Sequence, residues 1–188
     1  MSHMSYNLGR RIVVVGTSGS GKTYVARGLA DRLNIPYICN DAILFRENWQ
    51  PNPPAARLAE FDAATCGPAW TYDGNIGALK APEDRLILSR ADTIIWIDLP
   101  RRDVMRFLLW RTIRRSWMRE SLWHGNRESW RLSFASRDSV LLWAWQTYDA
   151  RRAQYQRIFA DRAWSHLHRT QLTSRRAVNR LLASVTRS

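Results

Sequence analysis

Hydrophobic residues along the chain form two kinds of pattern, short β-branched runs and longer stretches with helical spacing. The short runs predict five strands, over residues 11–15, 35–40, 69–73, 93–98 and 166–172. The longer stretches, with apolar residues three or four positions apart, predict helices over residues 23–33, 55–65, 101–119, 138–163 and 175–185. Because strands and helices alternate along most of the chain, we expect an α/β fold with a five-stranded sheet.

A glycine-rich stretch, GTSGSGKT at residues 16–23, separates the first predicted strand from the first predicted helix. It matches G-x-x-x-x-G-K-[ST], in which backbone N–H groups and the positive end of the helix bind the β-phosphate of a nucleotide. Lys22 is expected to reach the β- and γ-phosphate oxygens, and the Thr23 hydroxyl to ligate Mg²⁺. We therefore predict that ATP and Mg²⁺ bind here. The predicted nucleotide-binding residues are Gly16, Thr17, Ser18, Gly19, Ser20, Gly21, Lys22, Thr23 and Tyr24.

Three aspartates stand at the ends of predicted strands, where ligands bind in α/β sheets. Asp41 is expected to orient or deprotonate an acceptor hydroxyl, a role compatible with capping the helix that begins at Ala42. Asp73 and Asp98 are both candidates for the carboxylate that holds the magnesium waters. The residue pattern alone leaves the choice between Asp73 and Asp98 open.

The net charge of +13 lies entirely in the second half of the chain. Through Asp98, eight arginines and two lysines balance ten acidic residues, whereas from Leu99 onward nineteen arginines face six acidic residues. Arginine donates paired hydrogen bonds to phosphate, so this excess suits phosphate contacts. It would also attract polyanions such as nucleic acid.

The helix predicted over residues 101–119 carries two columns of side chains with a spacing of four. The first column is apolar and predicts the buried face: Met105, Leu109, Ile113 and Trp117. The second column consists of Arg111, Arg115 and Arg119. Since like charges at this spacing repel, we expect a negatively charged group to face the arginine column.

Several of these segments resemble the adenylate kinase-like branch of P-loop kinases, and most of all the small bacterial proteins described as DNA topology modulation proteins or adenylate kinase-related kinases. The resemblance rests on the glycine-rich stretch at residues 16–23, called the P-loop, on Asn40-Asp41-Ala42 followed by Trp49, and on residues 70–75, 90–93 and 125–130. It implies a three-layer P-loop fold of the nucleoside and nucleotide kinase type, with a parallel sheet. It also implies a mobile, arginine-rich helical lid over about residues 111–137, whose arginines close on the transferring phosphoryl group.

The resemblance also assigns roles to individual positions. It implies that Asp73, rather than Asp98, lies near magnesium, and that Arg111 stands where a lid arginine belongs. The arginine that stacks on adenine in the family falls on Phe107 of this chain. Within the polar lid loop, Arg127 is our first candidate for a second phosphate contact.

One departure from the family concerns the acceptor. In adenylate kinases a Phe-Pro-Arg follows the Asp-Gly pair and its arginine binds the phosphate of the acceptor, but residues 75–77 of this chain are Asn-Ile-Gly. We therefore predict an ATP-dependent kinase that phosphorylates a hydroxyl of a small molecule. One alternative is a nucleic-acid-associated NTP-binding protein or NTPase, although no nucleic-acid recognition motif is present. The other alternative is a nucleoside monophosphate kinase.

Residues 10–188 are predicted to form a single domain, and residues 1–9 are interpreted as a tag remnant with a flexible N-terminus. No apolar stretch approaches the roughly 20 residues that span a bilayer, and no signal-peptide pattern precedes Arg10. We expect a cytoplasmic protein without a membrane partner. The spacing of Cys39 and Cys66 is typical of neither a metal site nor a disulfide framework, and both are interpreted as small core residues.

Overall fold

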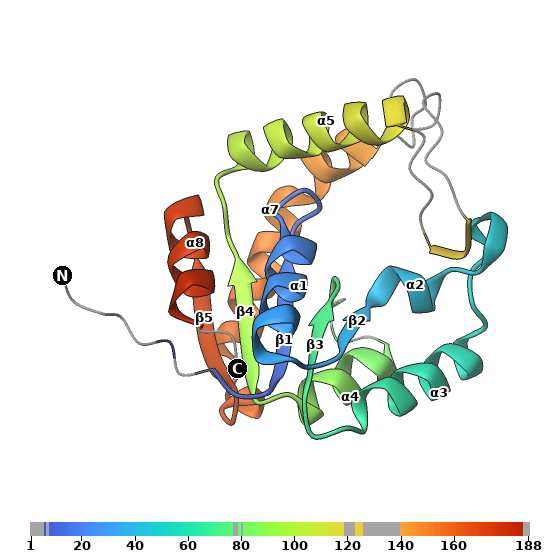
Figure 1. Cartoon of the computed structure of the whole chain (residues 1–188), viewed down its shortest axis with the longest axis vertical. Coiled ribbons are helices and arrows are strands. Elements are labelled where there is room, and N and C mark those ends of the chain that lie inside the picture. The colour runs from blue at the N-terminus through green and yellow to red at the C-terminus, as the bar shows by residue number, and fades with distance from the viewer. Residues whose placement is uncertain are drawn as a thin grey trace.

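The computed structural model describes residues 6, 8–76, 79, 81–118, 123–125 and 140–185, and five parallel strands form the sheet at its centre (Figure 1). The strands are β1 (Arg11–Gly16), β2 (Tyr37–Cys39), β3 (Trp70–Asp73), β4 (Thr93–Ile97) and β5 (His168–Leu172). Their order across the sheet is β2-β3-β1-β4-β5. The chain leaves β1 toward one edge and later returns to its other side, so the carboxyl end of β1 is a topological switch point, where α/β sheets bind ligands.

Helices cover both faces of this sheet in the part of the chain that the structure describes. They are α1 (Lys22–Leu33), α2 (Asn40–Leu44), α3 (Pro54–Thr65), α4 (Pro82–Arg90), α5 (Arg101–Met118), α7 (Val140–Ala160) and α8 (Arg175–Ser184). Three single turns of 3₁₀-helix join them: η1 (Glu47–Trp49), η2 (Trp123–Gly125) and η3 (Arg162–Trp164).

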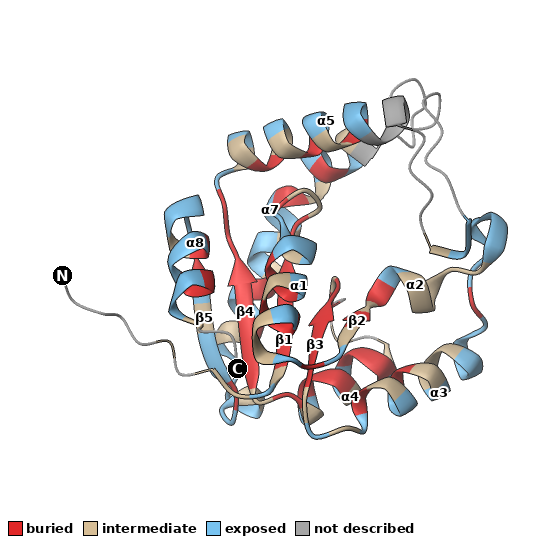
Figure 2. Cartoon of the chain, viewed as in Figure 1, coloured by how far each residue is buried: buried red, intermediate tan, exposed pale blue. Residues whose placement is uncertain are grey.

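Two hydrophobic clusters, one on each face of the sheet, make the fold three-layered. On one face α1 and α8 pack on Ile12, Val14 and Ile95. On the other face α3, α4 and α7 pack on Val13 and Val15. The three central strands β3, β1 and β4 are almost wholly buried (Figure 2), and β1 and β4 are accordingly near-continuous apolar runs, whereas the edge strand β5 is mostly exposed. The predicted three-layer α/β fold with five parallel strands is therefore confirmed.

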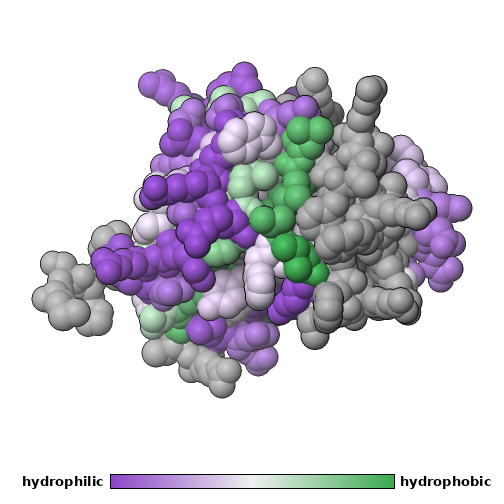
Figure 3. Space-filling view, turned by 90° about the horizontal axis from the view of Figure 1, so that it is seen from above, coloured by the Kyte–Doolittle hydropathy of each residue, from purple (hydrophilic) through white to green (hydrophobic). Residues whose placement is uncertain are grey.

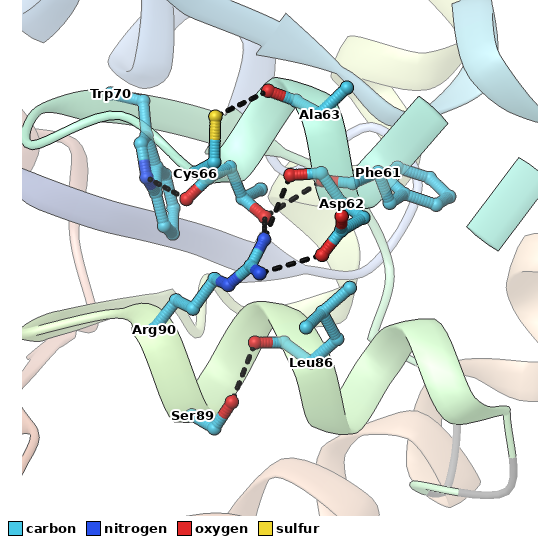
Figure 4. Close-up of polar contacts among 9 residues, drawn as sticks. Phe61, Asp62, Ala63, Cys66, Trp70, Leu86, Ser89 and Arg90 are labelled. Atoms are coloured by element: carbon cyan, nitrogen blue, oxygen red, sulfur yellow. Dashed lines mark hydrogen bonds and ion pairs between the residues drawn. The ribbon is translucent and has the colours of Figure 1, made fainter. Parts of the chain in front are cut away.

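Helix α4 was not predicted, although its first turn carries recognisable signals. Pro82 occupies the first helical position, and Glu83 and Asp84 follow it where the helix dipole favours negative charge. Arg90, in its last turn, donates to the backbone oxygen and the carboxylate of Asp62 and to the hydroxyl of Thr65 (Figure 4). Arg90, the first residue of the segment 90–93 that carries part of the family resemblance, thus holds α4 against α3. The adjacent Cys66 is exposed, so its interpretation as a core residue was wrong.

The buried face of α5 differs from the predicted one. Leu109 and Ile113 are 42% and 36% exposed, whereas Val104 and Leu108 are buried. Figure 3 looks down on the end of the molecule at which α5 lies, and it shows hydrophobic side chains at the surface among hydrophilic ones. The reason is a tertiary contact: a Cβ on Gly19 would lie 2.8 Å from the Leu108 Cβ and 2.9 Å from the Val104 oxygen. The P-loop therefore sits directly against α5 and decides which of two apolar columns is buried.

The N-terminal turn of α5 is also fixed to α7. The Arg101 guanidinium lies over the rings of Trp145 and Tyr148, with 4.6 and 4.9 Å to their centroids, and pairs with Asp149 at 2.5 Å. No helix among the described residues is long and apolar enough to cross a membrane.

Candidate functional site

The P-loop connects the buried end of β1 to the first turn of α1. Gly16 and Gly19 have φ angles of +156° and +83°, and a Cβ at Gly16 would lie 2.6 Å from the Ser20 Oγ and 2.8 Å from the Ile97 oxygen. Both positions therefore require glycine. Because the loop is this tight, its backbone N–H groups and the N-terminus of α1 can converge on one anion.

Lys22 and Thr23 are the first two residues of α1. The Lys22 ammonium donates to the Thr17 oxygen at 3.1 Å, so it folds back over the loop. Burial lowers the pKa of Lys22, the charges of Asp73 and Asp41 raise it, and those of Arg111 and Arg151 lower it. Two carboxylates and two guanidinium groups therefore surround this lysine at electrostatic range.

Asp73 ends β3 beside the first turn of α1. Its Oδ2 accepts hydrogen bonds from the Thr23 hydroxyl at 2.5 Å and from the Tyr37 hydroxyl at 3.0 Å. Burial and the charge of Asp73 raise the pKa of Tyr37, so its hydroxyl keeps its proton and acts as a donor. A hydroxyl and a carboxylate are the hard oxygen donors that Mg²⁺ prefers, so this pair fits the metal.

The described residues contain no group of three or more His, Cys, Asp or Glu side chains able to hold a metal. This arrangement is compatible with the usual coordination of Mg²⁺, in which substrate phosphates and waters complete one or two protein ligands.

Asp98, the competing candidate, has different neighbours. Arg152 of α7 donates two hydrogen bonds from Nε, at 2.9 and 3.2 Å, and one from Nη2 at 3.1 Å. Gln171 of β5 adds a further bond of 2.8 Å. The structure therefore brings Asp73, and not Asp98, to Thr23.

A cavity of about 350 Å³ extends from the P-loop to the gap between α5 and α8. Its phosphate end is lined by residues 19–24 and by Arg111. Its far end is lined by Leu99, Phe107, Arg175, Val178 and Asn179. There the Arg175 guanidinium lies 4.6 Å from the centroid of the Phe107 ring. The cavity thus joins the P-loop to a partly apolar compartment that contains an aromatic ring.

Asp41 lies in the first turn of α2 and is exposed. It does not cap this helix: α2 begins at Asn40, one residue before Asp41, and Cys39 precedes it without a side-chain cap. The Asn40 amide donates to the Asp41 Oδ1 at 3.1 Å, and the Tyr72 hydroxyl donates to the Asn40 oxygen at 2.6 Å. Asp41 is thus supported from the buried end of β3.

Helix α7 contributes three residues that sequence reasoning missed as site residues. The Tyr155 hydroxyl donates to the Asn75 oxygen at 3.3 Å and lies 3.5 Å from the Gly16 oxygen. Burial raises the pKa of Tyr155 to about 12, while the charge of Arg151 lowers it. The charge of Arg151 thus acts on both Tyr155 and Lys22, while its guanidinium lies 5.5 Å from the centroid of the Trp143 ring. Gln154 donates to the Ile76 oxygen at 2.6 Å. The missed signal was an arginine four positions before Tyr155, on the buried side of a helix.

Arg127 lies outside the residues that the structure describes, as does most of the predicted lid over 111–137. Of that segment, residues 111–118 complete α5, and η2 approaches α2, with the His124 Nε2 2.9 Å from the Ala42 oxygen.

Comparison with known proteins is informative at the level of structure. Neither a protein-family model nor a curated protein matches the sequence. The shikimate kinase from Acinetobacter baumannii in complex with shikimate is similar, with a TM-score of 0.57 and 16% identity over 96% of this chain and 92% of that chain. A gluconokinase from Sinorhizobium meliloti 1021 gives a TM-score of 0.51 and 18% identity over 96% of this chain and 92% of that chain.

The YorR protein from Bacillus subtilis, in complex with phosphorylated GDP, is similar over 93% of this chain and 92% of that chain. Its TM-score is 0.53 and its identity to this chain is 12%. At such identities the likeness concerns the fold. The chain therefore has the α/β fold of P-loop kinases, with its glycine-rich loop at the switch point of the sheet.

Proposed function

We propose that the protein is an ATP-dependent phosphotransferase that transfers the γ-phosphate to a hydroxyl group of a small molecule. The observation that carries this proposal is the convergence of Lys22 and the Thr23–Asp73 pair at the phosphate end of the nucleotide-sized cavity. The names of two structural neighbours, shikimate kinase and gluconokinase, support a hydroxyl acceptor.

In this proposal the nucleotide occupies the cavity from end to end. The P-loop N–H groups, Lys22 and Arg111 bind the phosphates, and the base lies at the far end against Phe107 and Arg175. Thr23 and Asp73 hold magnesium, which when bound neutralises charge on the β- and γ-phosphates. Both residues already share a hydrogen bond, so little rearrangement is needed to hold the ion.

On the acceptor side, Asp41 orients the attacking hydroxyl and accepts its proton. Arg151 is the proposed contact to the transferring phosphoryl group, since its charge, like that of Arg111, lowers the pKa of Lys22. Arg127 is the proposed further contact from a lid over residues 111–137. Asn75 occupies the region where adenylate kinases carry the acceptor-phosphate arginine, and it accepts a bond from Tyr155, which favours an acceptor without a phosphate.

Two alternatives give different outcomes in the same assay. A nucleoside monophosphate kinase would phosphorylate a phosphate, and a nucleic-acid-associated NTPase would hydrolyse ATP faster when DNA or RNA is added. Membership of the group described as DNA topology modulation proteins stays a prediction, and it does not decide between these activities.

The test is transfer of labelled γ-phosphate from ATP, with Mg²⁺, to a panel of sugars, cyclitols, nucleosides, nucleoside monophosphates and DNA. A phosphate ester formed with one hydroxyl compound and lost in Lys22→Ala is the expected result. Label that appears only as inorganic phosphate, at a rate raised by DNA, would overturn the proposal.

A further inference from the structure

Tyr37 reaches the candidate metal carboxylate from the neighbouring strand. In the parallel register Cys39 pairs with Asp73, so the two side chains lie on the same face of the sheet. Tyr37 lies two residues earlier on β2 and shares that face, which is the face covered by α1. Its long side chain extends along the strand, and its hydroxyl lies 3.0 Å from the Asp73 Oδ2.

The ring of Tyr37 is held from the same helix that carries Thr23. The Arg27 guanidinium lies 5.0 Å from the centroid of the Tyr37 ring, and Arg27 follows Thr23 by one turn of α1. The two hydroxyls that bind Asp73 are therefore both fixed relative to α1. A change in the orientation of the carboxylate would break both hydrogen bonds together.

Both donors use the same oxygen of Asp73. Thr23 and Tyr37 each donate to Oδ2, and among the contacts of the described residues Oδ1 accepts none. A carboxylate fixed through one oxygen presents its other oxygen in a single direction. Hydrogen-bonded partners commonly orient metal-site carboxylates in this way. Thr23 also keeps the lone pairs of its hydroxyl for a cation when its proton points at Asp73.

We infer that Tyr37 is a positioning residue of the magnesium site, whose hydroxyl fixes the Asp73 carboxylate so that Oδ1 faces the metal and its waters. The inference rests on the proposed role of Asp73 in binding magnesium. Tyr37 itself touches neither the nucleotide nor the metal in this arrangement. Its effect should therefore be seen in magnesium-dependent binding and be absent from metal-free nucleotide binding.

The test compares ATP affinity with Mg²⁺ and with EDTA by isothermal titration calorimetry, for the wild type and for Tyr37→Phe. Phenylalanine keeps the ring and its contact with Arg27 and removes only the hydroxyl. We expect the affinity for MgATP to fall about 10-fold, the lower end of the range for partners of metal-site ligands, with metal-free affinity within about twofold. Tyr148→Phe is the matched control, since it removes a tyrosine hydroxyl bonded to the Leu99 oxygen at 2.7 Å, away from Asp73.

A double-mutant cycle with Asp73→Asn separates this inference from the proposal on which it rests. If Tyr37 acts through Asp73, Tyr37→Phe has no further effect on MgATP affinity once Asp73 is asparagine. Additive losses, an equal loss with and without metal, or an equal loss in Tyr148→Phe would overturn the role of Tyr37 alone. Wild-type MgATP affinity in Asp73→Asn would overturn the magnesium role of Asp73, and the role of Tyr37 with it.

Discussion

Strands β3 and β4 flank β1, and each leads to an aspartate at the carboxyl edge of the sheet, yet the two aspartates have opposite surroundings. Asp73 receives two neutral hydroxyl donors, Thr23 and Tyr37. Asp98 receives the guanidinium of Arg152 and the amide of Gln171. Hydroxyl donors leave the negative charge of a carboxylate available to a cation, whereas an arginine neutralises it. The partners, and not the strand-end position, decide which carboxylate can serve magnesium.

The largest expected effect is that of Asp73→Asn. Removing the charge beside Thr23 should lower phosphoryl transfer about 100-fold, at the upper end of losses for metal-site partners, with little change in thermal stability. Initial rates as a function of Mg²⁺ concentration check this, and excess Mg²⁺ should restore part of the activity. Unchanged rates in Asp73→Asn would remove the distinction between the two aspartates.

Two consecutive arginines of α7 sharpen the comparison, because the charge of Arg151 lowers the pKa of Lys22, whereas Arg152 pairs with Asp98. Arg151→Ala should lower turnover about 10- to 100-fold, because a charged contact to the transferring phosphoryl group is lost. Arg152→Ala is its matched control and should keep turnover within about threefold, since the ion pair with Asp98 is structural. A larger loss of turnover in Arg152→Ala than in Arg151→Ala would reverse the assignment.

Phe107→Ala tests the far end of the cavity. Loss of a ring that stacks on the base should raise the KM for ATP about 10-fold and leave kcat nearly unchanged, because base–aromatic stacking contributes about 1–3 kcal/mol. Steady-state kinetics separates the two constants. A fall in kcat at unchanged KM would contradict the placement of the base against this ring.

The smallest effect on activity is expected for Asp98→Asn. It should keep turnover within about threefold and lower the free energy of unfolding by about 1–2 kcal/mol, a modest value because the Arg152 side chain is 47% exposed. Chemical denaturation measures the loss. Magnesium-dependent loss of activity in this variant, of the size expected for Asp73→Asn, would contradict the account.

Sequence patterns were sufficient to predict those features of the fold and the site that depend on residues close together in the chain. The P-loop was predicted because its glycines, Lys22 and Thr23 are consecutive and their flanking strand and helix have clear periodicity. The choice between Asp73 and Asp98 was left open by the pattern, because the partners of Asp98 are 54 and 73 residues away in the chain. The resemblance to adenylate kinases selected Asp73 for magnesium, and this assignment stays a prediction.

Long-range packing explains the errors. The buried face of α5 was assigned to Leu109 and Ile113 because two apolar columns run along the helix, and only the approach of Gly19 selects Leu108. Arg151 was missed for a related reason, since the surroundings of an arginine on α7 depend on β1 and the P-loop. Tyr37 received no role because its distance to Asp73 follows from strand register and not from spacing in the sequence.

The most direct test of the account measures the fate of labelled γ-phosphate in four proteins side by side: wild type, Lys22→Ala, Asp73→Asn and Asp98→Asn. The account predicts a phosphate ester of a small hydroxyl compound with the wild type and Asp98→Asn, none with Lys22→Ala and little with Asp73→Asn. Label recovered only as inorganic phosphate from all active proteins, or equal ester formation by Asp73→Asn and wild type, would contradict it.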